Sequence, residues 1–103
     1  MSMGRGERSD LFEWDEDKRR SVIERHGIDF EDAIQIFDGP VWETLSPRPG
    51  EQRWLAIGVV DGIEIAVIYT VRNGCRRIIT ARRARIDERQ KYHASIIGGG
   101  NPP

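Results

Sequence analysis

The sequence is poor in the features that mark secreted, membrane-bound and metal-dependent proteins. A single cysteine, Cys75, excludes an internal disulfide, which is typical of a chain that works in a reducing cytoplasm. No apolar run approaches about 18 residues, and the N-terminus lacks the apolar core of a signal peptide. His26, Cys75 and His93 are scattered without metal-ligand spacing. We therefore predict no metal site, no cofactor and no membrane partner.

Charged residues are abundant and unevenly distributed. They make up 32% of the 103 residues, yet the formal net charge is only −1. Residues 7–38 hold eleven acids and five bases, whereas residues 76–91 hold seven bases and two acids. The basic segment begins with interleaved apolar residues, which predicts a strand that runs into a helix. Arginines on such a fixed scaffold suit a polyanion, because guanidinium groups bind phosphate oxygens in pairs and stay charged.

Length and patterning predict one α+β domain at 11–97, between a disordered tail at 1–10 and a flexible tail at 98–103. Asp15 and Asp29 are good N-caps for two successive helices, and Gly27 can end the first of them. The second helix should bury the stripe Phe30, Ala33, Ile34 and Phe37. The expected elements are a short strand at 11–14, helices at 16–26 and 30–37, strands at 41–45, 53–60, 63–72 and 75–83, and a helix at 86–97. The predicted architecture is therefore two N-terminal helices packed on an antiparallel meander of three to four strands, closed by a C-terminal helix.

The pairs Asp61-Gly62 and Asn73-Gly74 favour two-residue type I′ turns, which set the register of the meander unless a bulge intervenes. The expected cross-strand neighbours are Trp54 with Tyr69, Arg53 with Thr70, Tyr69 with Ile78, Thr70 with Arg77, and Ile65 with Arg82. In a regular strand Arg77 and Arg82 differ in parity, so we expect them on opposite faces of the sheet. Both faces are rather apolar, so the C-terminal helix, a partner protein or both should cover the one that the N-terminal helices leave bare.

In its order of motifs the chain resembles the BrnT toxins over residues 12–93. The segments that carry the resemblance are Phe12-Glu13-Trp14-Asp15, Lys18, Arg25–Ala33, Phe37-Asp38, Glu51–Gly58, Val67–Thr70, Arg77–Arg82, Ala84, Glu88 and Tyr92. The chain departs from the family pattern at Val22, Arg25, Gln52 and Thr80, and in the proline-containing loop at 46–50. The resemblance implies a toxin of a bacterial type II toxin–antitoxin module with a RelE-like fold, which cleaves RNA and blocks translation. It also implies a BrnA-like antitoxin with a ribbon–helix–helix domain, and operator DNA bound only through the complex of the two proteins.

RNA cleavage by its own 2′-hydroxyl needs a base, an acid and cations that stabilise the extra charge on phosphorus. RelE-like enzymes typically achieve this without metal, and the resemblance implies the same here. The candidate catalytic residues are Arg77, Arg82, Glu88, Tyr92 and His26. The candidate RNA-binding residues are Lys18, Arg53, Arg76, Arg83, Arg85 and Arg89.

Each candidate residue also has a plain structural interpretation. The arginines could form ion pairs, for example with Glu88. Glu88 and Tyr92 lie four residues apart on one helix face, where a glutamate often forms a salt bridge and a tyrosine often belongs to the core. His26 could simply cap a helix C-terminus, because it precedes Gly27. An alternative function also stays open, namely a non-catalytic toxin-like subunit that binds an antitoxin and modulates its operator DNA binding.

Overall fold

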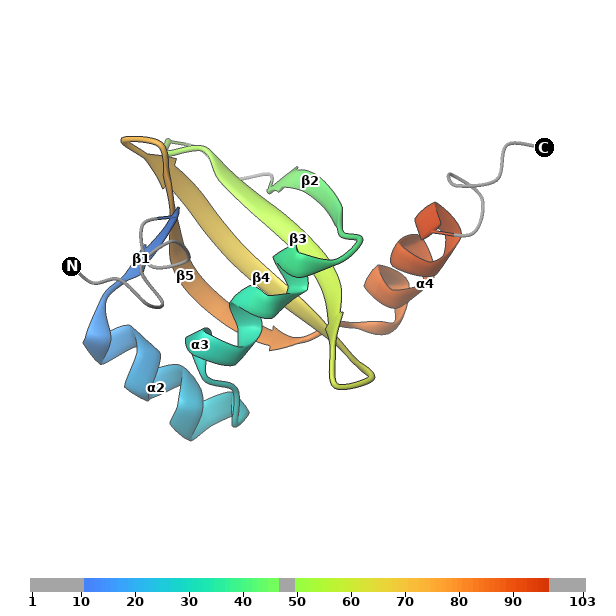
Figure 1. The fold of residues 1–103 in the computed structure, drawn as a ribbon, viewed down its shortest axis with the longest axis horizontal. Coiled ribbons are helices and arrows are strands. Elements are labelled where there is room, and N and C mark those ends of the chain that lie inside the picture. The colour runs from blue at the N-terminus through green and yellow to red at the C-terminus, as the bar shows by residue number, and fades with distance from the viewer. Residues whose placement is uncertain (1–10, 47–49, 97–103) are drawn as a thin grey trace.

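A five-stranded mixed sheet with the order β1-β5-β4-β3-β2 forms the centre of the fold (Figure 1). The computed structural model describes residues 11–46 and 50–96. The strands are β1 (Phe12–Trp14), β2 (Trp42–Ser46), β3 (Arg53–Val60), β4 (Ile63–Arg72) and β5 (Cys75–Arg83). The bounds of β3, β4 and β5 match the prediction. Both predicted turns have positive φ at their two central residues, as a type I′ turn requires.

The expected purely antiparallel sheet of three to four strands is wrong, because β1 joins the sheet parallel to β5. Aromatic packing holds β1 in this position: the Phe12 ring lies 5.5 Å from that of Phe37, and the Trp14 ring lies 5.8 Å from that of Phe30. The added strand also protects an edge of β5 that would otherwise expose its backbone hydrogen-bonding groups.

The N-terminal helices begin as predicted, but the second one changes its geometry. In α2 (Glu16–His26), Asp15 accepts hydrogen bonds from two backbone amides of the first turn, and Gly27 ends the helix at φ 69°. The second helix is only α3 (Phe30–Ala33), which continues as the 3-10 helix η1 (Ile34–Asp38). This tighter winding buries Ile36, which the predicted stripe omitted. Gly58 of β3 makes room for it, since a Cβ at that position would lie 2.6 Å from the Cβ of Ile36.

The helices pack on opposite faces of the sheet. We call the face beneath α2, α3 and η1 the core face; it holds the larger hydrophobic cluster, which includes Val67, Tyr69 and Ile78. The opposite face, the far face, holds a smaller cluster in which Ile57 and Ala66 pack against Tyr92 of α4 (Ile86–Ala94). The helix α4 covers one end of the far face, as expected for a helix that must shield apolar residues there. Ile97, the predicted end of this helix, and the predicted tails 1–10 and 98–103 lie outside the described residues.

A bulge in β5 changes the register that the sequence predicted. Tyr69 pairs with Ile78 and Thr70 with Arg77, as expected, but Ile68 pairs with Thr80, so the ladder skips Ile79. The expected pairing of Ile65 with Arg82 is therefore wrong. Ile65 pairs with Arg83, and Ala66 pairs with Arg82.

The bulge also moves side chains between the two faces of the sheet. Thr70 and Ala66, the partners of Arg77 and Arg82, have the same parity on β4, so both arginines lie on the far face and not on opposite faces. Ala81, which an unbroken strand would place on the far face with Arg77, instead belongs to the buried core cluster. Bulges of this kind re-aim side chains, and here one brings two basic residues to the same side of the sheet.

Candidate functional site

A row of polar residues crosses all five strands on the far face. Glu13 of β1 pairs with Arg77 of β5, which pairs with Thr70 of β4. The pairing of Trp54 with Tyr69 places Arg53 of β3 beside Thr70, and Arg53 pairs with Ser46 of β2. We call these five residues the polar row. It lies near the end of the sheet that carries the β4–β5 turn, at the upper left of Figure 1, away from α4.

The arginines at this end of the far face are held by long, partly solvated contacts. Arg77 Nη1 lies 3.4 Å from Glu13 Oε2, and about a third of the Arg77 side chain (32%) is exposed. Glu51, just before β3, lies 3.8 Å from Arg53 and 3.4 Å from Arg72. Ion pairs of this length and exposure contribute little to stability, so the guanidinium groups can exchange their partners for a phosphate at low cost.

The hydroxyl of Thr70 lies at the centre of the polar row. It is buried and donates a hydrogen bond of 2.7 Å to the backbone carbonyl of Gln52. This bond fixes the approach to β3, and with it the positions of Glu51 and Arg53 on either side of Gln52. Thr70 is therefore a positioning residue of the row, between the two arginines that the sequence predicted as its neighbours.

At the other end of the far face, Arg82 is held quite differently. Its Nη1 and Nη2 each donate a 2.8 Å hydrogen bond to a different oxygen of Glu88, whose side chain is only 9% exposed. Glu88 also accepts a 2.9 Å bond from the backbone amide of Arg85 at the start of α4. The hydrogen bonds from Arg82 lower the pKa of Glu88 and the hydrogen bond to Glu88 raises the pKa of Arg82, so both groups stay charged near neutral pH. The pair joins β5 to α4.

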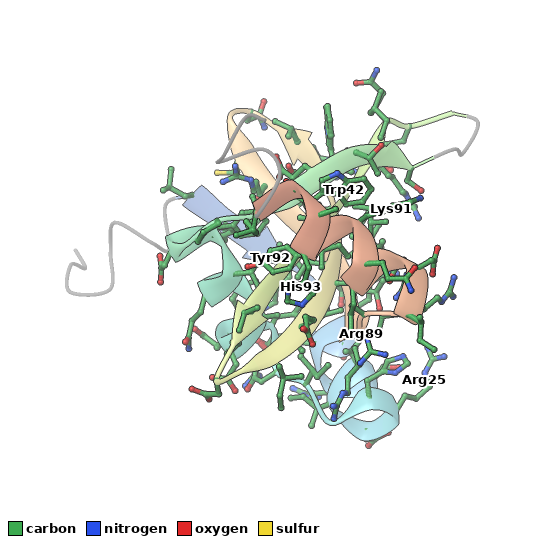
Figure 2. The ribbon with its side chains drawn as sticks, turned by 90° about the vertical axis from the view of Figure 1, so that its right-hand side faces the viewer. Arg25, Trp42, Arg89, Lys91, Tyr92 and His93 are labelled. Atoms are coloured by element: carbon green, nitrogen blue, oxygen red, sulfur yellow. The ribbon has the colours of Figure 1, made fainter. Side chains whose placement is uncertain are left out.

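The remaining predicted catalytic residues do not join the polar row. Tyr92 is buried against Ile57, and its hydroxyl donates to the carbonyl of Pro40 at 3.4 Å (Figure 2). His26 is exposed at the end of α2, a helix that packs on the core face through Val22. Arg77 and Arg82 share a face, but their partners on β4 are four residues apart, or about 13 Å along the strand.

Of the predicted RNA-binding residues, only Arg53 belongs to the polar row. Arg76 packs on the core face, with its guanidinium carbon 4.4 Å from the centroid of the Phe37 ring. Arg83 pairs with Ile65 on that same side. The other three are exposed on helices or at a helix start, namely Lys18 on α2, Arg85 just before α4 and Arg89 on α4. Figure 2 shows Arg89 on α4.

Sequence reasoning missed Glu13, Glu51 and Arg72 as members of this surface. Arg72 could have been found, because it lies two residues from Thr70 on a predicted strand and so shares its face. Glu51 is close in sequence to Arg53, which was a weaker signal. Glu13 gave none, since its contact with Arg77 depends on the parallel pairing of strands that are 64 positions apart.

Residues 11–46 and 50–96 were searched for a metal site and for a membrane-spanning helix. No group of three His, Cys, Asp or Glu side chains there is arranged to hold a metal ion. In the same ranges no helix combines the length and the apolar character needed to cross a membrane.

Comparison with known proteins identifies one family. A family model described as "ribonuclease toxin, BrnT, of type II toxin-antitoxin system" matches residues 14–88. The match covers the sheet from the end of β1 to the end of β5 and reaches Glu88. No curated protein matches the chain.

Proposed function

The chain belongs to the BrnT family of ribonuclease toxins from type II toxin–antitoxin systems, and on that premise we propose that it is an endoribonuclease whose reaction centre is the polar row. The observation that carries the proposal is the state of Arg77. It projects from a rigid central sheet, it is partly exposed, and its one described carboxylate partner is 3.4 Å away. A phosphodiester can therefore reach this guanidinium without breaking a strong ion pair.

In the proposed reaction, the 2′-hydroxyl of RNA attacks the adjacent phosphorus. A bond forms between O2′ and phosphorus, the bond from phosphorus to O5′ breaks, and the products are a 2′,3′-cyclic phosphate and a free 5′-hydroxyl. Arg77 stabilises the added negative charge on the phosphoryl oxygens, and Arg53 binds the neighbouring phosphate of the RNA backbone. Glu13 is the carboxylate beside Arg77, so it is placed to take the 2′ proton and to return a proton to the leaving 5′ oxygen. Every step uses side chains of this chain and none requires a metal.

We assign Arg82 and Glu88 a structural role, outside the reaction centre. The guanidinium donors of Arg82 that face Glu88 are occupied, and removing them would leave a buried carboxylate unpaired. The pair instead holds α4 against the end of the sheet, together with Tyr92. This assignment differs from the catalytic roles predicted from sequence for Arg82, Glu88 and Tyr92, and the variants in the Discussion separate the two.

Membership of a type II toxin family implies an antitoxin partner and an RNA substrate. We propose that the antitoxin is BrnA-like, with a ribbon–helix–helix domain, and that the toxin contacts operator DNA only through it, in the cytoplasm. The exposed Arg72 and the partly exposed Arg53 and Arg77 favour an acidic antitoxin segment that covers the polar row, since such a segment would compete directly with RNA.

One observation favours the alternative, in which the chain is a non-catalytic partner of the antitoxin. Arg53, Arg72, Arg77 and Arg82 each have a carboxylate within 4.0 Å, so the far face is less electropositive than its arginines suggest. A subunit of this kind would alter operator affinity of the antitoxin and leave RNA intact.

The decisive experiment compares purified wild-type protein with Arg77→Ala on a structured RNA substrate, with the 3′ ends of the products identified chemically. We expect cyclic phosphate ends from the wild type and a large loss of rate in the variant. Arg20→Ala is the matched control, because Arg20 is a well-exposed arginine of α2 with a weak 3.9 Å contact to Asp17. If the folded wild type leaves RNA intact while it changes the operator affinity of its antitoxin, the alternative function is correct.

A further inference from the structure

A pocket of about 350 Å3 opens on the core face, at the end of the sheet that carries the β4–β5 turn. Its size falls in the range of about 300–1,000 Å3 that is usual for small-ligand sites. The residues that line it come from five segments of the chain and mix aromatic, apolar and charged side chains. They are Leu11, Glu43, Trp54, Tyr69, Val71, Gly74 and Arg76.

Two opposite charges frame this pocket: a tyrosine hydroxyl holds the negative one, and aromatic rings hold the positive one. The hydroxyl of Tyr69 donates a 2.5 Å hydrogen bond to Oε2 of Glu43. Burial and the Glu43 carboxylate raise the pKa of Tyr69, so the hydroxyl keeps its proton and continues to donate. The guanidinium carbon of Arg76 lies 4.4 Å from the centroid of Phe37 and 5.4 Å from that of Tyr69, so these rings hold its positive charge beside the pocket.

This arrangement matches the hydrogen-bonding groups of one nucleobase. Guanine has two neighbouring donors, N1–H and the N2 amino group, which suit a carboxylate. It also has two neighbouring acceptors, O6 and N7, which suit a guanidinium. Trp54 supplies an aromatic surface on which a base can stack. We propose that the pocket binds an unpaired guanine of single-stranded RNA, with Glu43 and Arg76 reading its edges and Trp54 stacking on its ring.

The polar frame favours a base over a peptide side chain. An aliphatic residue of a partner protein would cover Glu43 and Arg76 without satisfying them, which costs free energy. Arg76 and Arg77 are consecutive on β5 and point to opposite faces, so an RNA strand that crosses the β4–β5 turn can contact the pocket and the polar row together. The inference thus rests on the proposed RNA-cleaving function and adds a base preference to it.

The test uses oligonucleotides that cannot be cleaved, so that binding is measured independently of catalysis. Four 2′-O-methyl heptamers of uridine, with G, A, C or U at the centre, are titrated with wild-type protein and followed by fluorescence anisotropy. We expect the guanine heptamer to bind about tenfold more tightly than the other three, a difference that one well-placed bidentate contact supplies. Equal binding of all four heptamers by the wild-type protein would overturn the inference of a guanine site. If the protein cleaves RNA but shows no guanine preference, the proposed function holds and the guanine site does not.

The variant Glu43→Gln tests the reading of the donor edge. An amide presents one acceptor oxygen where the carboxylate presents two, so the preference for guanine should fall to threefold or less. Glu24→Gln, an exposed exchange on α2, is the matched control and should keep the full preference. Circular dichroism checks that both variants are folded. If folded Glu43→Gln keeps the tenfold preference for guanine, the pocket is not a guanine site. The same conclusion follows if the variant weakens binding of the antitoxin and leaves RNA binding unchanged.

Discussion

Two arginines on strand β5 lie on the same face of the sheet and are held in opposite ways. Arg82 donates two hydrogen bonds of 2.8 Å to a carboxylate that is 9% exposed, whereas Arg77 makes one contact of 3.4 Å to a carboxylate that is 43% exposed. Removing a partner from the first pair would leave a buried charge, which is expensive. Removing a partner from the second pair would leave a charge that water can solvate, and this costs little free energy. The residue type and the face are the same, so what separates an anchor from an available cation is the burial of its partner.

The first way to sharpen this comparison is to remove the buried carboxylate. Glu88→Ala should lower the free energy of unfolding by about 3 kcal/mol, because it leaves Arg82 unpaired and frees the start of α4. Urea denaturation measures the change. The double variant Arg82→Met/Glu88→Leu should recover most of the loss, since apolar side chains of similar volume replace the pair. Loss of less than about 0.5 kcal/mol, the value expected for the exposed control Glu24→Ala, would show that the pair is no anchor.

The second test removes the available cation, Arg77. Arg77→Ala should slow RNA cleavage about 100-fold, because one fixed donor to the transition state is lost, and should leave the free energy of unfolding nearly unchanged. Initial cleavage rates and urea denaturation on the same preparations measure both quantities. A variant that cuts RNA as fast as Arg20→Ala would contradict the assignment of Arg77 to the reaction centre.

The third test uses pH to measure the contribution of the Arg82–Glu88 ion pair to stability. The pKa of Glu88 is lowered in the folded protein by its hydrogen bonds from Arg82, so the pair stabilises the fold fully above the pKa of an unfolded glutamate, about 4.3. This contribution is lost as the pH falls below that value and through the lower folded pKa. The difference in unfolding free energy between wild type and Glu88→Gln should therefore shrink from pH 6 to pH 3. A difference that stays constant or grows on acidification would be inconsistent with the ion pair.

The smallest expected effect concerns the centre of the polar row. Thr70→Val removes the hydrogen bond to the Gln52 carbonyl and should cost about 1 kcal/mol of unfolding free energy. Cleavage should slow by a few-fold, because Arg53 loses its fixed position beside Arg77. Thr80→Val, the same exchange on the neighbouring strand β5, serves as the control. Equal effects from both variants would argue against a positioning role for Thr70.

Local signals were sufficient to predict much of the fold. The capping aspartates, the Gly27 stop and the two Asp-Gly and Asn-Gly turns all act within a few residues, so helix starts and the three long strands could be read directly. The parallel pairing of β1 with β5 and the change from α3 to η1 could not, because they depend on packing between distant segments such as Phe12 and Phe37.

The site was harder to predict than the fold for the same reason. A single skipped residue, Ile79, decides which face Arg82 occupies, and nothing in the residue pattern of β5 marks a bulge there. The structural alternative for Arg82, an ion pair with Glu88, could be named from sequence because a strand leads directly into the helix. Its geometry and burial, which decide between anchor and catalyst, required the tertiary structure.

The comparison between the two arginines is tested most directly by Arg77→Lys and Arg82→Lys, measured for both cleavage rate and unfolding free energy. Lysine keeps the charge and loses the two-pronged donor. We predict that Arg77→Lys loses at least tenfold in rate with unchanged stability. We predict that Arg82→Lys loses about 1–2 kcal/mol in stability, while its folded fraction cleaves RNA at the wild-type rate. The opposite pattern, with a stable Arg82→Lys that no longer cleaves and an Arg77→Lys that cleaves normally, would contradict the account.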